Sequence, residues 1–402
     1  MTLPLYKLNG KPKFDVAKSH VGLWFDKFCH QWCPDPKKLG PEAWTLQPFQ
    51  ATNPKLDWIR AVAPDKKPAG DPGLLAEHAD RTKNLVRTLG GQSMMFNTTS
   101  RFATGLGREH PVENGFAWHP SLGVPYLPSS SVKGLVRAWV EGGWSEEKID
   151  AATFHGIFGS DYRRGSSRHD EARCLAPQSG TVIFFDALPV APVQLKADVM
   201  TPHYGDYYEK REVPGDWLSP NPIPFLTVAL GQLFQFALAP RANGERDKQD
   251  CARAVQWLKA ALIWLGAGAK TAVGYGRFER DQEAEELAEK KHRDAEVKAA
   301  LDARLTKLNP IARELEKAAL AGKWDQDKNA FAKEGVIEEW LAKLETTANA
   351  DAIHRLRDLV NHHFPGLLAN PEKTEGKQNK PAFKSRQRQF ATRLNTLINK
   401  TS

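Results

Sequence analysis

The residues best suited to chemistry lie in one glycine-rich stretch, residues 265–278, which reads LGAGAKTAVGYGRF. Four glycines alternate there with two cations, a threonine and a tyrosine. Glycine adopts left-handed backbone conformations and lets another chain come close, and backbone amides beside cations bind phosphates. The pattern therefore predicts a loop that binds the phosphate chain of a nucleic acid. A helix C-cap followed by a turn is the structural alternative.

Two familiar phosphate-binding loops do not match this stretch. A P-loop has Gly before its Lys-[Ser/Thr] pair, whereas Ala269 precedes Lys270 here. Apolar residues recur at helical spacing over residues 250–265, and residues 272–279 alternate like a short strand, so the loop is predicted to join a helix to a strand. A dinucleotide-binding loop would need a third glycine and a leading strand, and both are missing.

A second stretch suited to phosphates is residues 128–140, PSSSVKGLVRAWV. We expect a serine N-cap to begin a helix here, with its apolar residues in one stripe and with Lys133 and Arg137 on another face. Amides at a helix N-terminus, serine hydroxyls and two cations suit phosphate binding. A capped helix with a solvated face would show the same pattern.

An insertion between two predicted strands, residues 196–216, mixes tyrosines with cations. Aromatic rings stack on unpaired bases and cations contact the phosphates between them, so this composition suits single-stranded RNA. A protein-contact loop would have the same composition. The tyrosines and cations are Lys196, Tyr204, Tyr207, Tyr208, Lys210 and Arg211.

Length and composition set the outer limits. With 402 residues, a net charge of +8 and a pI near 9.1, the chain has room for two or three domains and fits an anionic partner. Four scattered cysteines indicate a reducing compartment, and without a long apolar run or a signal peptide we expect a cytoplasmic protein that does not enter membranes. Cys29, His30 and Cys33 do not have zinc-knuckle spacing, so we expect neither a metal nor a cofactor.

The predicted elements that position these residues run strand (92–104), helix (from 129), strand (180–190), insertion, strand (225–238), helix (250–265) and strand (272–279). This βαββαβ order predicts an α+β, ferredoxin-like fold, which RNA-recognition domains also use. We expect three parts: an aromatic-rich segment (1–90) with a helix at 73–89, the ferredoxin-like domain (91–280), and a helical extension (281–402). The extension is predicted to end in a solvated basic tail, with a short helix at 389–398.

Three separated motifs together resemble the RAMP proteins of type III CRISPR systems. GAKTAVGYGRF is similar to the glycine-rich loop of that superfamily, PSSSVKGLVRAW to the motif that begins its first helix, and HGIFGS (155–160) to the motif after that helix. The arrangement most resembles the sixth subunit of the type III-B Cmr effector complex. The resemblance covers about residues 90–280 and says little about the helical extension.

The resemblance implies an antiviral ribonucleoprotein in which this subunit caps a filament near the 3′ region of the guide RNA and supports target RNA binding. It implies as partners the guide and target RNA, other RAMP subunits and the small helical subunit. The insertion would correspond to the thumb-like hairpin of RAMP proteins. Together, the resemblance and the composition of these stretches predict RNA contacts at Ser130, Lys133, Arg137, Lys196, Tyr204, Lys270, Thr271, Gly274, Tyr275, Gly276 and Arg277.

Catalysis is the first alternative. RAMP subunits that cut target RNA use an aspartate after the first strand, and residues 105–128 contain no Asp. RAMP enzymes that process guides use histidine, so His110, His119 and His155 are candidate general acids or bases for a metal-independent ribonuclease. We expect structural roles for these histidines and a non-catalytic RNA-binding protein. The second alternative is a protein-interaction adaptor with a vestigial RNA loop.

Overall fold

The computed structural model describes residues 14–30, 32–34, 44–46, 53–160, 178–202, 205–213, 215, 217, 220–347, 349–375 and 380–401. The chain divides into two compact units, Met1–Glu286 and Leu287–Ser402, each with its own hydrophobic core. Helix α8 (Gln282–Thr306) runs across this boundary. Among the described residues, no helix has the length and the apolar run needed to cross a membrane.

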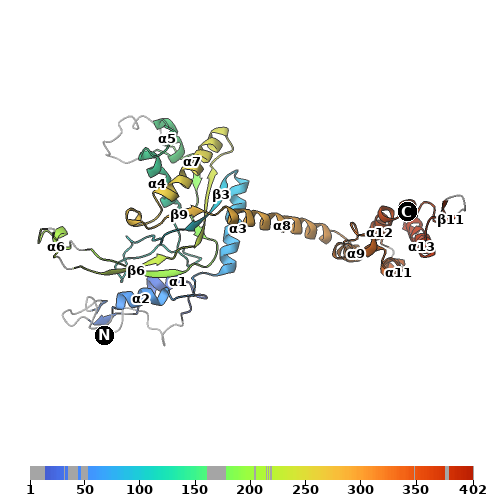
Figure 1. Ribbon diagram of the computed structural model, residues 1–402, viewed down its shortest axis with the longest axis horizontal. Coiled ribbons are helices and arrows are strands. Elements are labelled where there is room, and N and C mark those ends of the chain that lie inside the picture. The colour runs from blue at the N-terminus through green and yellow to red at the C-terminus, as the bar shows by residue number, and fades with distance from the viewer. Residues whose placement is uncertain are drawn as a thin grey trace. The chain divides into compact units, whose positions relative to one another are not determined.

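An antiparallel sheet forms the centre of the first unit (Figure 1). Its strand order is β4-β8-β3-β9, and β5 also pairs with β8. The strands are β3 (Gln92–Thr98), β4 (Val182–Phe184), β5 (Leu188–Pro189), β8 (Leu233–Pro240) and β9 (Phe278–Arg280). This sheet and the helices around it confirm the α+β class.

Helices cover both faces of the sheet. Helices α4 (Ser129–Glu141) and α7 (Glu245–Trp264) contact each other and the strands from one side, and α3 (Pro72–Thr88) packs on the other, as predicted for residues 73–89. Buried Gln235 of β8 donates to the Ala79 carbonyl of α3, so its neighbours Phe234 and Phe236 point to the opposite face by alternation. Burial on both faces explains why β8 is almost continuously apolar.

The predicted single strand over residues 225–238 is wrong. It is two strands, β7 (Ile223–Val228) and β8, separated by a turn at Gly231, whose φ is +70°. The Thr98 hydroxyl donates to the Ala229 carbonyl (2.9 Å), which fixes the turn against β3. The turn is marked in the sequence only by Gly231 and Gln232, and the prediction passed over this short interruption because the residues on both sides of it are mostly apolar.

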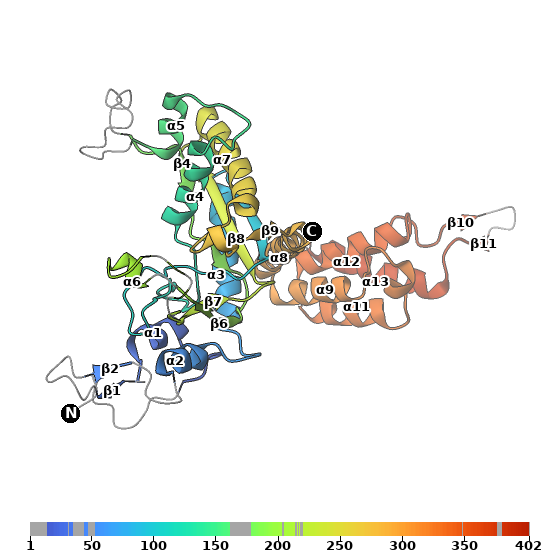
Figure 2. The ribbon, with the colours of Figure 1, turned by 60° about the vertical axis from the view of Figure 1, so that its left-hand side comes forward.

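Strand β7 pairs instead with β6 (Leu195–Met200) in a separate two-stranded ribbon. The predicted insertion at 196–216 therefore begins inside β6 rather than in a loop. The short helix α6 (Gly205–Tyr208) belongs to the segment that connects β6 to β7 along the chain. Helices α1 (Val21–Lys27) and α2 (Pro54–Val62) lie beside this ribbon (Figure 2). Another short ribbon pairs β1 (Cys33–Pro34) with β2 (Trp44–Thr45).

The second unit is mainly helical, and its core is built from leucines, aromatics and alanines. A buried carboxylate, Glu316, accepts hydrogen bonds from Arg304 (3.1 Å) and Arg355 (2.6 Å), which ties the end of α8 to the helices that follow. The elements after α8 are α9 (Pro310–Ala321), α10 (Lys328–Phe331), α11 (Val336–Thr347), α12 (Ala350–His363), β10 (Thr374–Glu375), β11 (Lys380–Pro381) and α13 (Ser385–Thr401).

The short helix predicted at 389–398 is confirmed, but the prediction of a solvated basic tail is wrong for residues 385–401. They form α13, whose Phe390, Leu394 and Leu397 are buried against the other helices. Its arginines pair with carboxylates across the unit: Arg386 with Glu338, Arg388 with Glu372, and Arg393 with Glu345. The acids that balance these arginines are distant in sequence, so the tail looked uncompensated. The unit as a whole stays basic, with 22 Lys and Arg against 16 Asp and Glu in residues 287–402.

Candidate nucleic-acid interface

The glycine-rich stretch is a loop pinned to the segment after β3. The Ala269 amide donates to the Ala103 carbonyl (2.7 Å) and the Gly276 amide to the Arg101 carbonyl (2.8 Å). A 3-10 turn, Thr271–Val273, stands where the strand 272–279 was predicted, and β9 begins only at Phe278. The predicted strand is thus present as β9, which pairs with β3, but it is shorter and starts later than expected, because the Ala269 and Gly276 amides bond to residues 101–103 instead of to a strand.

The glycines of the loop serve two purposes. At Gly276, where φ is +71°, a Cβ would lie 1.9 Å from the Ala267 carbonyl oxygen, so glycine is needed for two parts of the chain to touch. At Gly274, where φ is +95°, a Cβ would meet nothing within 4 Å, so glycine supplies only the left-handed turn. Gly276 therefore lies beneath the loop, and exposed Gly274 lies at its outer side.

Arg277 turns inward toward the chain's own backbone. Its guanidinium donates to the carbonyls of Trp264 and Ile263 (3.4 Å) at the C-terminal end of α7, and to that of Thr271 (3.5 Å). Carbonyls at a helix C-terminus lack partners within the helix, and a cation there also meets the negative end of the helix dipole. Arg277 thus holds the loop to the end of α7, in a role that sequence cannot distinguish from phosphate binding.

Tyr275 joins the loop to the β6–β7 ribbon. Its hydroxyl donates to Asp198 of β6 (2.7 Å), and Arg101 pairs with the same carboxylate (2.6 Å). Burial raises the pKa of Tyr275 to about 12, and the bond to Asp198 adds to the rise. Burial alone would raise the pKa of Asp198, but hydrogen bonds from Tyr275, the Val199 amide and Arg101 outweigh it and the net pKa is lowered. Sequence reasoning missed Arg101 and Asp198, which carry no local motif.

Lys270 has a left-handed backbone, with φ +61°, at the start of the 3-10 turn. Its ammonium group lies 5.5 Å from the centre of the Phe225 ring, and that ring is 5.8 Å from the ring of Tyr275. A cation over an aromatic face is attracted by the ring quadrupole. Lys270 and Thr271 therefore lie at the outer part of the loop, beside exposed Ala272, Val273 and Gly274.

Helix α4 is predicted correctly, but its cap is not. Pro128 is the N-cap and makes no side-chain capping bond; the Ser129 amide instead donates to Asp186 (2.6 Å). A carboxylate takes the place expected for a serine hydroxyl, since acids are favoured at helix N-termini. A phosphate at this amide would meet Asp186, so the predicted anion site at the helix N-terminus is not supported.

The cations of α4 follow the side of the helix next to α5 (Ala151–Phe158). Arg137 donates to Glu141 (2.8 Å) and lies 5.4 Å from the ring centre of Phe154 on α5. Lys133 is half-buried and Ser130 is exposed in the first turn. The three predicted contacts on α4, Ser130, Lys133 and Arg137, do not line the groove between this helix and the glycine loop.

The glycine loop and α4 border one open groove of about 700 Å³. Ser131, Leu135 and Ala138 line it from α4, and Thr271 and Arg277 line it from the loop. The segment 104–107 and two tryptophans, Trp144 and Trp264, complete it. None of the described residues lining it is acidic.

The remaining predicted contacts lie elsewhere. Lys196 of β6 pairs with Asp65, and this bond lowers the pKa of the Asp65 carboxyl. Tyr204 lies outside the described residues. Tyr207 and Tyr208 belong to α6 and are exposed, with ring centres 5.5 Å apart.

Two of the candidate histidines are engaged in the fold. His110 stacks on Phe25 with ring centres 4.2 Å apart; its Nε2 lies 3.0 Å from the Phe25 carbonyl, and its Nδ1 accepts from the Val112 amide (3.2 Å). Burial lowers the pKa of His110, which keeps the ring neutral. His119 accepts from the Leu122 amide (3.2 Å) and lies 5.6 Å from the ring of His78.

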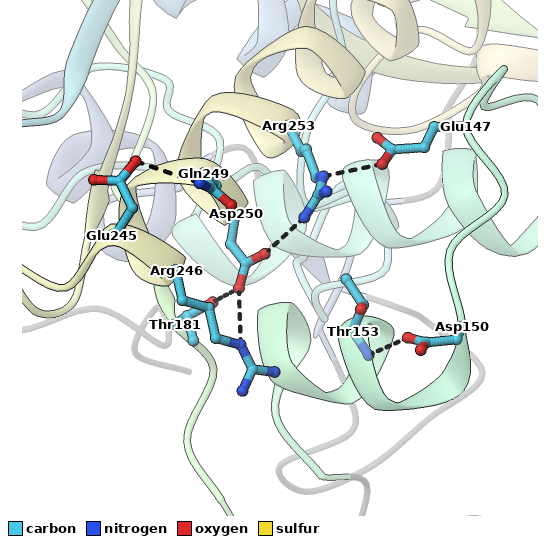
Figure 3. Close-up of polar contacts among 9 residues, drawn as sticks. All are labelled: Glu147, Asp150, Thr153, Thr181, Glu245, Arg246, Gln249, Asp250 and Arg253. Carbon is cyan, nitrogen blue, oxygen red and sulfur yellow. Dashed lines mark hydrogen bonds and ion pairs between the residues drawn. The ribbon is translucent and has the colours of Figure 1, made fainter.

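The HGIFGS motif joins α5 to β4 rather than lining the groove. The Thr181 amide donates to the Gly156 carbonyl (2.8 Å), and the Thr181 hydroxyl donates to Asp250 of α7 (2.9 Å). Asp250 is buried and also accepts from Arg253 (3.3 Å), which pairs with Glu147 before α5 (Figure 3). This network locks α5, β4 and α7 together. The network stabilises the fold, and its residues carry no local sequence motif.

Comparison with known proteins agrees with this geometry. The family model for the RAMP superfamily matches residues 95–279. The CRISPR system Cmr subunit Cmr6 of Pyrococcus furiosus is 33% identical over 244 residues, which cover 48% of this chain and 69% of that protein. The Cmr6 subunit of Saccharolobus solfataricus is 26% identical over 211 residues, which cover 50% of this chain and 63% of that protein.

Among solved structures, a type III-B Cmr-beta complex bound to cognate target RNA has a similar chain, with 23% identity and a TM-score of 0.43 over 56% of this chain and 71% of that one. The crystal structure of Pyrococcus furiosus Cmr6 has 30% identity and a TM-score of 0.28 over 48% of this chain and 98% of that one. The match of the family model to residues 95–279 assigns the domain that holds the glycine loop and α4 to the RAMP class, which confirms the resemblance. The chain belongs to the Cmr6 family of RAMP proteins.

Proposed function

We propose that this protein is a non-catalytic, RNA-binding subunit of a type III-B CRISPR effector complex, in which it contacts the guide RNA and supports target RNA binding. Membership of the Cmr6 family supports the assignment to a Cmr complex. The observation that carries RNA binding is the groove between the glycine loop and α4. It is lined by Arg277 and by three hydroxyl side chains, those of Thr104, Ser131 and Thr271, and none of its described lining residues is acidic. Lys270 lies in the loop between two of the lining residues, Ala269 and Thr271.

The finer parts of the proposal rest on the family and on topology. The strand order β4-β8-β3-β9, with α4 and α7 on one face, supports a ferredoxin-like RAMP domain. The β6–β7 ribbon with α6 between its strands is a candidate for the thumb-like hairpin. We further propose a cytoplasmic complex in which this subunit caps the filament near the 3′ region of the guide, beside other RAMP subunits and the small helical subunit.

The test of RNA binding is a salt titration with Lys270→Gln. Each phosphate contact on a single strand contributes about 0.7 to the slope of log K against log salt concentration, so we expect the slope to fall by about that amount. Lys66→Gln is the matched control, because Lys66 is also a lysine outside helices and strands with a left-handed backbone (φ +59°). Equal slopes for the two variants would contradict the assignment of Lys270. Arg277 is unsuitable here because its loss would disturb the loop itself.

The test of assembly is recovery of the tagged protein from its native cells, followed by sequencing of the bound RNA and identification of bound proteins. Repeat-derived guide RNA with other RAMP subunits is the expected result. RAMP subunits without RNA would favour the adaptor alternative. The free protein alone would contradict the proposal.

Absence of catalysis is also proposed. The contacts of both His110 nitrogens to backbone groups support it, since a general acid or base needs a nitrogen that can reach the substrate. We expect the purified chain to leave guide and target RNA intact. Cleavage that a His119→Ala change abolishes would establish the ribonuclease alternative.

A further inference from the structure

We propose that unpaired bases of the bound RNA stack on Trp144 and Trp264 in the groove beside the glycine loop. This inference rests on the proposed RNA-binding function and names the part of the nucleotide that the groove recognises. Family membership assigns no role to these two residues. They come from segments about 120 residues apart, and both line the same groove.

Both rings are exposed although tryptophan is usually largely buried. Trp144, after α4, is 55% exposed, and Trp264, the last residue of α7, is 67% exposed. Neither position is needed for the core that α4 and α7 form against the sheet, which contains Val132, Val136 and Leu258 instead. Exposed aromatic rings at two points of one groove require a reason beyond stability.

The fold holds the ring of Trp144 in place. Its centre lies 5.9 Å from that of Trp139, which is buried, and its Nε1 is so close to Gly142 that a Cβ at that glycine would lie 2.2 Å away. Trp264 is held at its backbone, because the Arg277 guanidinium donates to its carbonyl. A ring that is already positioned, as that of Trp144 is, loses little conformational entropy on binding, which favours stacking.

The charges around the rings favour a nucleic acid over an apolar peptide. Lys270 lies between two residues that line the groove, Ala269 and Thr271, and no acid is found among the described lining residues. Arg277 also lines the groove and adds positive charge, although its guanidinium donates to backbone carbonyls. A strand with exposed bases presents flat faces to tryptophan and phosphates to cations, whereas bases inside a duplex are already stacked. The occupant is therefore a single-stranded segment of RNA.

The test compares two replacements of Trp264 in the full-length chain, using a fluorescently labelled single-stranded RNA. Trp264→Phe keeps an aromatic face, whereas Trp264→Leu keeps an apolar side chain without one. We expect affinity to fall about fivefold or more in the Leu variant and much less in the Phe variant, since base stacking on an aromatic residue is worth about 1–3 kcal/mol. The salt slope should stay unchanged, because stacking releases no counterions.

The same pair at Trp144, Trp144→Phe and Trp144→Leu, gives an independent measurement should a Trp264 variant fail to fold. Equal affinities for the Phe and Leu variants at both positions would overturn the proposal. The proposal would also be overturned if the tryptophan variants lost a protein partner from the native complex while their RNA affinity stayed unchanged. The groove would then be a protein contact. If wild type binds RNA and Lys270→Gln weakens it, but the tryptophan variants do not, only the stacking inference fails. If wild type binds no RNA, the proposed function fails with it.

Discussion

Arg277 and Lys270 are seven residues apart in one loop, and their side chains do different things. A guanidinium is attracted both to phosphate oxygens and to the free carbonyls that end a helix, so the sequence pattern cannot tell these uses apart. In the structure, Arg277 donates to carbonyls at the end of α7, whereas Lys270 lies over Phe225 at the outer part of the loop. Lys270 makes none of these carbonyl contacts, and its contact with RNA stays a prediction.

Removal of Arg277 should therefore lower the stability of the fold more directly than it weakens RNA binding. We expect Arg277→Ala to lower the free energy of unfolding by about 1–2 kcal/mol, from lost hydrogen bonds and lost charge at the helix end. Urea denaturation of the RNA-free chain measures it. Arg277→Lys should recover part of the loss, because it keeps the charge but not the fork of donors. Unchanged stability with weaker RNA binding would show that Arg277 contacts RNA directly.

His110 should make stability depend on pH. Because burial lowers its pKa below the ordinary 6.5, the unfolded chain takes up a proton that the folded chain resists. Its stabilising effect should be complete above about pH 6.5 and should decline as the pH falls below that value. Thermal unfolding between pH 7.5 and pH 5 checks it, using buffers of about constant ionic strength. His110→Gln should flatten the decline, whereas His354→Gln, on an exposed part of α12, should not.

At the scale of elements, Asp250 connects α7 to β4 and, through Arg253, to the segment before α5. Asp250→Ala would remove the buried acceptor of the Thr181 hydroxyl and one of the two carboxylates that Arg253 contacts. We expect a loss of about 1–3 kcal/mol of unfolding free energy. Gln249→Ala, at the preceding residue of α7, removes only an exposed bond to Glu245 and should change stability little. Similar losses of unfolding free energy in both variants would mean that the Asp250 network contributes no particular stability.

Elements with a clear period were predictable from sequence, and their interruptions were not. Helices α3, α4 and α7 carry apolar stripes on uninterrupted segments, so their positions follow from periodicity. The break between β7 and β8 is marked only by Gly231 and Gln232 between two apolar runs, and the Asp186 cap on α4 comes from 57 residues away. The α13 arginines pair with acids that are up to 48 residues away. Such contacts leave no local pattern.

For the candidate site, composition predicted the glycine loop and the helix beside it, because glycines, cations and a helix start are local signals. The groove they border was not predictable, since Trp144 and Trp264 reach it from separate segments. Lys196 was chosen for its charge alone, and it pairs with Asp65. Residue type thus indicated which segments matter better than it indicated which side chains face the groove.

At the scale of the whole molecule, two separate cores predict two separately folding units. We expect a fragment of residues 282–402, which keeps α8 whole, to be helical and to unfold cooperatively alone, because its core is composed of residues from that unit only. Circular dichroism through a thermal scan measures both properties. A fragment without a cooperative transition would contradict the division at Glu286.

The uneven division of charge between the units has a kinetic consequence. Residues 287–402 carry 22 Lys and Arg against 16 Asp and Glu, whereas the remaining 286 residues carry 34 against 32. If the nearly neutral first unit binds RNA as proposed, the basic unit attached to it should accelerate diffusional encounter with RNA through its field, with little effect on how long the complex lasts. In stopped-flow experiments at low salt, a chain ending at residue 286 should associate more slowly than the full chain and dissociate at a similar rate. The helical extension would then determine how quickly a guide is captured, while the groove determines how long it is held.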